Sequence, residues 1–368
     1  MNWIANIDTI MFDPEFDKEL NIEIISPYSK LIFSDYVLNE KLFWSYTNND
    51  FVGLVKKENK FNKNVSNLPS NLTHLFFGDK FNQDVLNLSQ TLTHLTFGYH
   101  FNKDVSNLPP TLTHLIFGWT FNQNVSNLPK NLIYLIFDWS FNNYVHNLPS
   151  SLTHLIFGWT FNKDASNFPS SLTHLTFGYE FNRNVSKLPP NLTHLIFKYY
   201  FNQDVSVLPS FLIHLVFGES FNQDVSNLPS FLTHLTFGNN FNQDISKLPS
   251  SITHLTLGIK FNQQCIIPSN IKYLKLDCNN LDIINYLPNS IIELELDYNF
   301  NLEVNNLPTS IKKLSICNFS HYNQDLNCLP DFIEELQLNR YYKKPILHIP
   351  SNLKKISCYH NYPYINDF

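Results

Sequence analysis

The sequence predicts a parallel β-solenoid in which each coil of about twenty residues contributes one short strand. Three observations support this fold. A block that begins at Phe61 recurs ten times, without an insertion, as far as Lys260. Each block contains a Leu-x-x-Leu-x-Phe pattern, or a close variant of it, with the alternation of a half-buried strand. A proline near the middle of most blocks prevents a helix from running through the rest of the coil.

The block from Phe101 to Thr120 illustrates the expected coil. Leu112, Leu115 and Phe117 have the spacing of residues that point into a core, and they predict a strand of about five residues. The remaining residues must bring the chain back so that the next strand starts alongside. Successive strands are therefore expected to be parallel neighbours.

The return segment of this block leaves two conformations open. Phe101, Val105 and Leu108 lie at i, i+4 and i+7, which is a helix-like spacing. The same residues also fit an extended return with turns. The pattern alone does not separate one helical or 3₁₀ turn from extended backbone.

The repeat divides the chain into three regions. Residues 1–50 do not follow the period, and we expect them to form a small amino-terminal cap, for which a helical conformation stays open. Residues 51–260 hold the regular coils, preceded by a faint capping coil with Val52 and Val55 at the correct offsets and Lys57 where a buried Phe should stand. Residues 261–368 have prolines 19 to 22 residues apart, which predicts looser coils and a carboxy-terminal cap.

Two motifs resemble known repeat families. The segment from Ile271 to Leu281 reads Ile-x-x-Leu-x-Leu-x-x-Asn-x-Leu, which is similar to the leucine-rich repeat signature. The regular blocks, with Phe-Asn-Gln-Asp-Val and Leu-Thr-His-Leu-x-Phe-Gly, resemble the FNIP repeats of amoebal and giant-virus proteins. The blocks depart from that family where Phe-Asn is followed by residues such as Gln203 and Asp204 in place of Ile-Pro. The resemblance implies a leucine-rich-repeat-like solenoid with interaction roles and no chemistry.

Composition excludes several classes of partner. The net charge is −6 and no run of like charges occurs, so we expect neither nucleic acid nor a membrane surface as a partner. Neither a signal peptide nor a transmembrane stretch is apparent. The five cysteines are odd in number and never spaced Cys-x-x-Cys, which favours free thiols and a cytoplasmic location.

Stacking of coils places equivalent residues about 4.8 Å apart, so each position of the block becomes a column. The Asn column, from Asn62 through Asn82 and Asn102 to Asn262, follows a buried Phe and is expected to bond backbone groups that the bend leaves unpaired. The His column precedes an inward Leu and is expected on the concave strand face. It comprises His74, His94, His114, His154, His174, His194, His214, His234 and His254, with Tyr134 as its exception.

The His column invites two chemical interpretations, and we favour neither. A metal site needs three or four ligands, but the neighbouring columns offer Thr, Ile and Gly, so no metal or other cofactor is expected. Nine equivalent histidines do not make one catalytic arrangement. Closely stacked imidazoles should also resist being protonated together. A structural role is therefore expected for this column.

The column after Gly is the most variable one. It carries large aromatic residues in six consecutive blocks: Tyr99, Trp119, Trp139, Trp159, Tyr179 and Tyr199. The preceding glycine permits unusual backbone angles and leaves the ring uncrowded. The rings could cover the end of the strand by packing on one another. Alternatively, they could form an interface for a partner, because Trp and Tyr are favoured interface anchors. These six residues are the candidate partner-binding site.

The sequence lacks the motifs of common enzymes, including phosphate-binding loops and nucleophile elbows. We therefore expect no enzyme but a protein–protein interaction solenoid that binds through its concave strand face and aromatic column. Two alternatives stay open. Residues 1–50 would make the chain a substrate-recognition subunit of a ubiquitin ligase if they formed an F-box, and the aromatic rings would suit a carbohydrate or small ligand.

Overall fold

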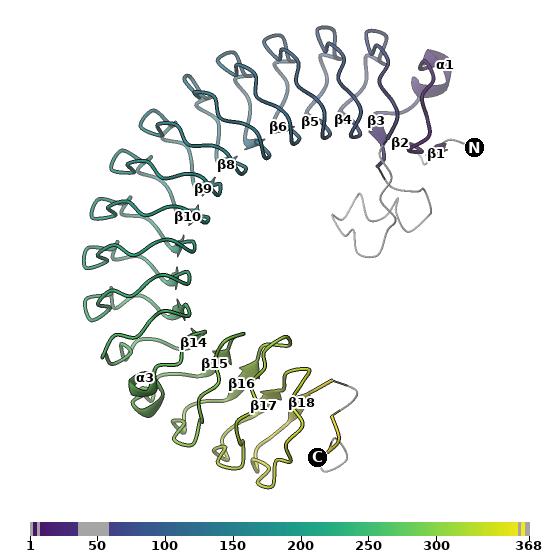
Figure 1. The fold of residues 1–368 in the computed structure, drawn as a ribbon. Coiled ribbons are helices and arrows are strands. Elements are labelled where there is room, and N and C mark those ends of the chain that lie inside the picture. The colour runs from purple at the N-terminus through teal and green to yellow at the C-terminus, as the bar shows by residue number, and fades with distance from the viewer. Residues whose placement is uncertain (1–2, 6–7, 36–58, 360–361, 365–368) are drawn as a thin grey trace. The chain divides into compact units, whose positions relative to one another are not determined.

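A computed structural model of the protein describes residues 3–5, 8–35, 59–359 and 362–364. The chain divides into two compact units, Met1–Phe181 and Asn182–Phe368, which we describe separately. In each unit, short strands follow one another along one side of the ribbon and the return segments run along the other side (Figure 1). The prediction of a parallel solenoid with one short strand per coil is confirmed.

Unit 1 contains nine described strands and one short helix. From β2 onward the strands pair in parallel with their neighbours in chain order, and β1 pairs antiparallel with β2. The elements are β1 (Trp3–Ala5), β2 (Thr9–Phe12), α1 (Ile22–Ile25), β3 (Lys30–Phe33), β4 (His74–Phe76), β5 (His94–Thr96), β6 (His114–Ile116), β7 (Tyr134–Ile136), β8 (His154–Ile156) and β9 (His174–Phe177).

Unit 2 also contains nine described strands, all parallel to their neighbours in chain order. The elements are β10 (His194–Phe197), β11 (His214–Val216), β12 (His234–Thr236), β13 (His254–Leu257), β14 (Tyr273–Leu276), α3 (Leu281–Asn285), β15 (Glu293–Leu296), β16 (Lys313–Ile316), β17 (Glu335–Gln337) and β18 (Lys355–Ser357). The strands in both units have three or four residues, one or two fewer than expected.

The return segments of the regular blocks are built from turns and extended chain, which decides between the two open conformations. In the block from Phe101, the side chain of Asp104 accepts the backbone N–H of Ser106 at 3.1 Å, and the Leu112 N–H donates to the carbonyl of Pro109 at 3.2 Å. Such local bonds compete with a helix. Helices occur in returns outside the regular blocks, in α1 and in α3, whose N-cap Asn280 accepts two backbone N–H groups.

Apolar side chains from the strand and the return meet inside each coil. Phe97 and Phe101 stack with ring centroids 3.6 Å apart, and the rings of Phe101 and Phe121 lie 6.1 Å apart between coils. Leu112, Leu115 and Phe117 are fully buried, as their spacing predicts. The core is therefore a continuous stack within each unit.

The Asn column forms a ladder of hydrogen bonds, and its expected role is confirmed. The Oδ1 atom of Asn102 accepts the backbone N–H of Asn122 at 2.9 Å, and Oδ1 of Asn122 accepts that of Asn142 at 3.0 Å. The same bond recurs from Asn202 to Asn222 in unit 2. Each Asn thereby fixes the register of the next coil at the bend.

The amino-terminal segment contributes a coil that the repeat pattern does not predict. Thr9 pairs with Lys30 in parallel register, and Lys30 pairs with His74, so residues 9–33 continue the sheet. Only the four residues of α1 are helical among residues 8–35. Residues 36–50 of the considered F-box, and Val52, Val55 and Lys57 of the expected capping coil, lie outside the described residues.

No helix among the described residues is long and apolar enough to span a membrane. This finding agrees with the absence of a hydrophobic stretch of about 20 residues in the sequence.

The Asn ladder yields a stability prediction. Asn122→Ala removes the acceptor for the Asn142 N–H. We expect the free energy of unfolding, measured by denaturant titration, to fall by about 1 kcal/mol. Asn122→Asp is the matched control because it keeps a side-chain oxygen at the same position. An equal loss in both variants would show that this oxygen does not stabilise the coil.

Candidate binding surface

The His column lies on the solvent side of the strands, and each histidine directly precedes a buried leucine. Its rings stack within each unit wherever the threonine before the histidine is kept in both neighbours. The ring centroids of His74, His94 and His114 are 4.2 Å apart in succession, and those of His234 and His254 are 3.9 Å apart. The column is half-buried, because each ring covers the face of the next.

A threonine hydroxyl holds each of these rings. Thr93 Oγ1 lies 2.9 Å from Nδ1 of His94 and donates to the carbonyl of Thr73 at 3.1 Å. His214 follows Ile213 instead, and its ring lies 5.6 and 5.7 Å from its neighbours with tilts of 37° and 54°. The hydroxyl therefore orients the imidazole in the stack.

The environment of the column disfavours protonation of its histidines. Burial, together with the neighbouring His74 and His114, lowers the pKa of His94 to about 4. Burial is also the main cause of the lowered pKa values of His74, His114, His214 and His254. The sequence predicts that repulsion between neighbouring histidines disfavours their protonation, but it does not predict the larger contribution of burial to their lowered pKa values.

The stacking does not suit chelation of one metal ion by neighbouring histidines. The lone pair of an imidazole lies in the ring plane, and the rings of His74 and His94 are within 9° of parallel, so their lone pairs do not converge. Among the residues that the structure describes, no group of three or more His, Cys, Asp or Glu side chains is arranged to hold a metal.

Five of the six aromatic candidates form one stack in unit 1. The centroids of Trp119 and Trp139 are 4.2 Å apart, those of Trp139 and Trp159 are also 4.2 Å apart, and the adjoining Tyr99 and Tyr179 lie 5.1 and 4.0 Å from their Trp neighbours. All five are half-buried, so their edges reach solvent while their faces cover one another.

The sixth candidate, Tyr199, belongs to unit 2. It is 43% exposed and contacts Tyr200 edge to face with ring centroids 4.8 Å apart. Tyr200 is itself 50% exposed.

Backbone hydrogen bonds fix the spacing of the aromatic stack. Ser140 donates its N–H to the carbonyl of Trp119 at 2.9 Å, and Thr160 donates to that of Trp139 at 2.9 Å. Each ring is therefore attached to a ladder that runs from coil to coil beside the strands.

Where a glycine precedes the ring, it allows close packing between coils and has no unusual backbone angle, which corrects our expectation. A Cβ atom on Gly118 would lie 2.1 Å from the carbonyl oxygen of Gly98, and one on Gly98 would lie 2.3 Å from that of Gly78. No glycine of this column has a positive φ angle. Nothing in the structure explains how Asp138 and Lys198 are accommodated in the column.

A hollow of about 300 Å³ opens between the strand face and the first rings of the stack. Thr96 and Ile116 of the strand face line one side, and Tyr99 and Trp119 line the other. Gly98 and Gly118 also line it, and they have no side chain to fill the space. Strand face and aromatic column thus border one depression.

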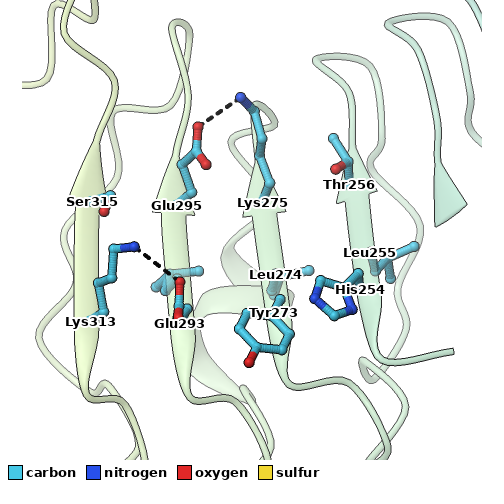
Figure 2. A pocket seen from close by; sticks show the side chains of 11 residues that line it. His254, Leu255, Thr256, Tyr273, Leu274, Lys275, Glu293, Glu295, Lys313 and Ser315 are labelled. Carbon is cyan, nitrogen blue, oxygen red and sulfur yellow. Dashed lines mark hydrogen bonds and ion pairs between the residues drawn. The ribbon is translucent and has the colours of Figure 1, made fainter. Parts of the chain in front are cut away.

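In unit 2 the strand face changes character after His254, a feature that our interpretation of the sequence missed. Lys275 contacts Glu295 at 2.7 Å and Lys313 contacts Glu293 at 3.2 Å, around a hollow of about 270 Å³ beside Tyr273 (Figure 2). Although burial lowers the pKa of Lys275, its carboxylate partners raise it to about 12. The signal was present as alternating Glu and Lys at outward strand positions.

A second missed feature is a pair of exposed phenylalanines in unit 2. Phe211 and Phe231 are 53% and 60% exposed and stack at 6.1 Å. In the other regular coils this position holds a polar residue such as Ser151, whose hydroxyl lies within hydrogen-bond distance of the carbonyls of Lys130 and Leu132. Two adjacent coils therefore replace an internal hydrogen bond with exposed aromatic surface.

Comparison with known proteins supports a repeat family. The family model of the FNIP Repeat matches residues 84–120, 104–137, 121–159, 144–180, 181–220, 221–260, 241–279, 261–296, 279–319 and 322–358, which together make up more than half of the chain. The structure of CroV588, described as a circular LRR protein, is 33% identical, with a TM-score of 0.65, and the match covers 98% of this chain and 71% of that one.

A more distant likeness concerns the fold alone. The functional domain of InlJ from Listeria monocytogenes is 19% identical, with a TM-score of 0.52, over 87% of this chain and 75% of that one. None of the curated proteins compared matches the chain.

The lowered histidine pKa values predict sensitivity to acid. In the unfolded chain an imidazole takes up a proton as the pH falls through about 6.5, whereas the pKa of His94 in the folded chain is about 4. Between these values the unfolded state binds more protons, so the free energy of unfolding decreases as the pH falls. We expect a lower Tm by circular dichroism at a pH near 5 than at a pH near 7.5.

A double variant, His94→Tyr with His114→Tyr, controls this experiment, because tyrosine already occupies the same column at Tyr134. Its Tm should decrease less between the two pH values. If the decrease is unchanged, other groups cause the acid sensitivity.

For the exposed phenylalanines we predict a substitution that does not destabilise the protein. Phe211→Ser supplies a hydroxyl where that of Ser151 lies within hydrogen-bond distance of two carbonyls of the preceding coil. We expect the free energy of unfolding to stay within about 0.5 kcal/mol of the wild type or to rise. A loss of more than about 1 kcal/mol in denaturant titration would show that the Phe211 ring is retained for stability.

Proposed function

The chain belongs to the FNIP-repeat family, and from that premise we propose that it is a non-enzymatic solenoid that binds a protein partner along its strand face and aromatic column. Leucine-rich-repeat-like solenoids are typical of protein-binding scaffolds, and repeat families of this kind are generally non-catalytic. The observation that carries the proposal is the stack of half-exposed rings from Tyr99 to Tyr179.

The stack is suited to binding because its rings are already fixed. Each ring is held by its neighbours and by the backbone ladder through Trp119 and Trp139. Side chains that are ordered before binding lose little conformational entropy when a partner docks. Trp and Tyr are also the residues most enriched among those that dominate interface energies.

The dimensions favour a protein over a small ligand. The stack runs through five successive coils, which at about 4.8 Å per coil is roughly 20 Å. The hollow beside Tyr99 and Trp119 adds a place for a protruding side chain. A protein partner can contact several coils at once, and each coil adds an equivalent aromatic position to the interface.

The stacking also weighs against the carbohydrate alternative. A sugar ring binds to an aromatic face, but the faces of Trp119, Trp139 and Trp159 lie 4.2 Å from one another and are covered. Their edges are what a ligand meets. Ring edges pack well against the side chains of a protein surface.

We propose further that the protein works in a reducing compartment, with the cytoplasm as the simplest choice. All five cysteines are free thiols. Burial raises the pKa of Cys265 to about 11 and that of Cys278 to about 12, so neither thiol is activated.

For residues 1–50 we propose the role of an amino-terminal cap, followed by the regular coils of 51–260 and the degenerate coils of 261–368. The support is that β1 pairs antiparallel along β2 and so covers the edge of the first parallel strand. Covered edges protect a sheet against unwanted pairing.

The test replaces Trp119, Trp139 and Trp159 together with alanine and measures which proteins are captured on the immobilised chain, by quantitative mass spectrometry. We expect specific partners to lose at least about tenfold in capture, in keeping with the loss of several interface anchors. A Trp→Tyr triple variant keeps stacked rings and should show a smaller loss.

The matched control replaces three exposed residues of return segments in the same unit, Asn107, Asn127 and Asn167, with alanine. This variant should capture partners as the wild type does. Unchanged capture by a folded Trp→Ala triple variant would rule out the aromatic column as the binding site.

A further inference from the structure

We infer that the threonine-partnered histidines of strands β4 to β6, His74, His94 and His114, are held as the Nδ1–H tautomer, and that their Nε2 atoms form a row of acceptors for amide, ammonium or guanidinium groups of a protein partner. The docking part rests on the proposed function, which supplies the partner. The tautomer part does not depend on it.

The first step is a count of protons at the threonine hydroxyl. Thr93 Oγ1 donates to the carbonyl of Thr73 at 3.1 Å and also lies 2.9 Å from His94 Nδ1. A hydroxyl has one proton, and a carbonyl oxygen only accepts. Once the proton points to the carbonyl, the contact with the ring is a hydrogen bond only if Nδ1 carries the proton.

The same geometry recurs in neighbouring coils of unit 1. Thr73 Oγ1 lies 3.1 Å from the carbonyl of Ser29 and 2.9 Å from His74 Nδ1. Thr113 Oγ1 lies 3.1 Å from the carbonyl of Thr93 and 2.9 Å from His114 Nδ1. In each coil, the Nδ1–H tautomer satisfies both contacts, whereas the other tautomer leaves two oxygens facing each other without a proton.

The second step concerns the other ring nitrogen. A neutral imidazole protonated at Nδ1 has its lone pair at Nε2. Within the described part of the chain, Nε2 of His74, His94 and His114 makes no hydrogen bond, and it is not enclosed by protein. Because these rings stack at 4.2 Å, three acceptors follow one another along strands β4 to β6.

A row of Nε2 acceptors binds groups that donate hydrogen bonds. Carboxylates and phosphates bring acceptors only, so they meet the Nε2 lone pairs without a proton between them and are disfavoured. Backbone and side-chain amides, lysine and arginine bring donors. The outward positions Thr96 and Ile116 carry no charge, and the charge of Lys30, which lies beside His74, is paired with Asp8.

The chain contains an internal control for this inference. His214 follows Ile213, which has no hydroxyl, and its ring is tilted out of the stack. Nothing comparable holds its Nδ1 proton. His214 should therefore show a mixture of both neutral tautomers, while the threonine-partnered rings show one.

The tautomers can be read directly by long-range ¹H–¹⁵N correlation NMR on the full chain labelled at histidine, near neutral pH. We expect a protonated Nδ1 and an unprotonated Nε2 for His74, His94 and His114. Thr93→Ile should release His94 from this state, whereas Thr93→Ser should keep it. The fold tolerates isoleucine at this position, as Ile133 and Ile213 show. A protonated Nε2 in the threonine-partnered rings would overturn the inference.

The docking part is tested with the same capture assay as the aromatic column. We expect the double variant Thr93→Ile with Thr113→Ile to lose at least about fivefold in capture of the partner, and the corresponding serine double variant to retain it. Equal capture by both overturns the docking part. The Trp→Ala triple variant decides the proposed function separately, so the two failures are distinguishable.

Discussion

The structure depends on one constraint: each coil must hydrogen-bond to the coil before it at several places along its length. The strands pair residue by residue, as His94 does with His114. Hydrogen bonds of the Asn ladder connect the bends of successive coils. The backbone carbonyls of the aromatic column accept the N–H groups of the next coil. These bonds recur through the regular coils, where every block has twenty residues. Beyond the regular coils, the 19 residues from His254 to Tyr273 and the 22 residues from Lys313 to Glu335 still keep the strand pairing.

This constraint explains why the sequence separates into columns with different freedom. Gly118 is restricted because the carbonyl of Gly98 lies where its side chain would be. Phe101 and Phe117 are restricted by a continuous core. The position of Trp119 is not restricted in this way, because only the backbone at that position belongs to a ladder. Aromatic, acidic, amide and aliphatic residues therefore replace one another at this position in the regular blocks.

The repeat made the fold predictable, since a fixed period and an alternating strand are local signals that the sequence displays ten times. The burial of Leu112, Leu115 and Phe117 and the Asn ladder followed from it. The coil of residues 9–33 did not, because its strands are continuous apolar runs, Thr9–Phe12 and Lys30–Phe33, which lack the histidine pattern. The return conformation was undecided because i, i+4 spacing suits more than one backbone.

The candidate surface was predictable only in part. The aromatic column stood out as a break in the repeat, and the structure places its members on one line in unit 1. The bond between Thr93 and His94 joins two different positions of the block, so no single column reveals it. Phe211 is a departure from a polar column whose role becomes visible only through the bonds of Ser151. The charges around Lys275 needed the register between strands.

The near-identity of the coils has a consequence for how the chain folds. A segment that docks one block out of place finds almost the same hydrogen bonds and the same core, so the energy gap between correct and shifted assemblies comes from the few residues that differ between blocks. Ile133 with Tyr134, Ile213 beside His214 and the helical return α3 are such residues. These residues therefore favour the correct pairing of neighbouring coils over pairings that are shifted by one block.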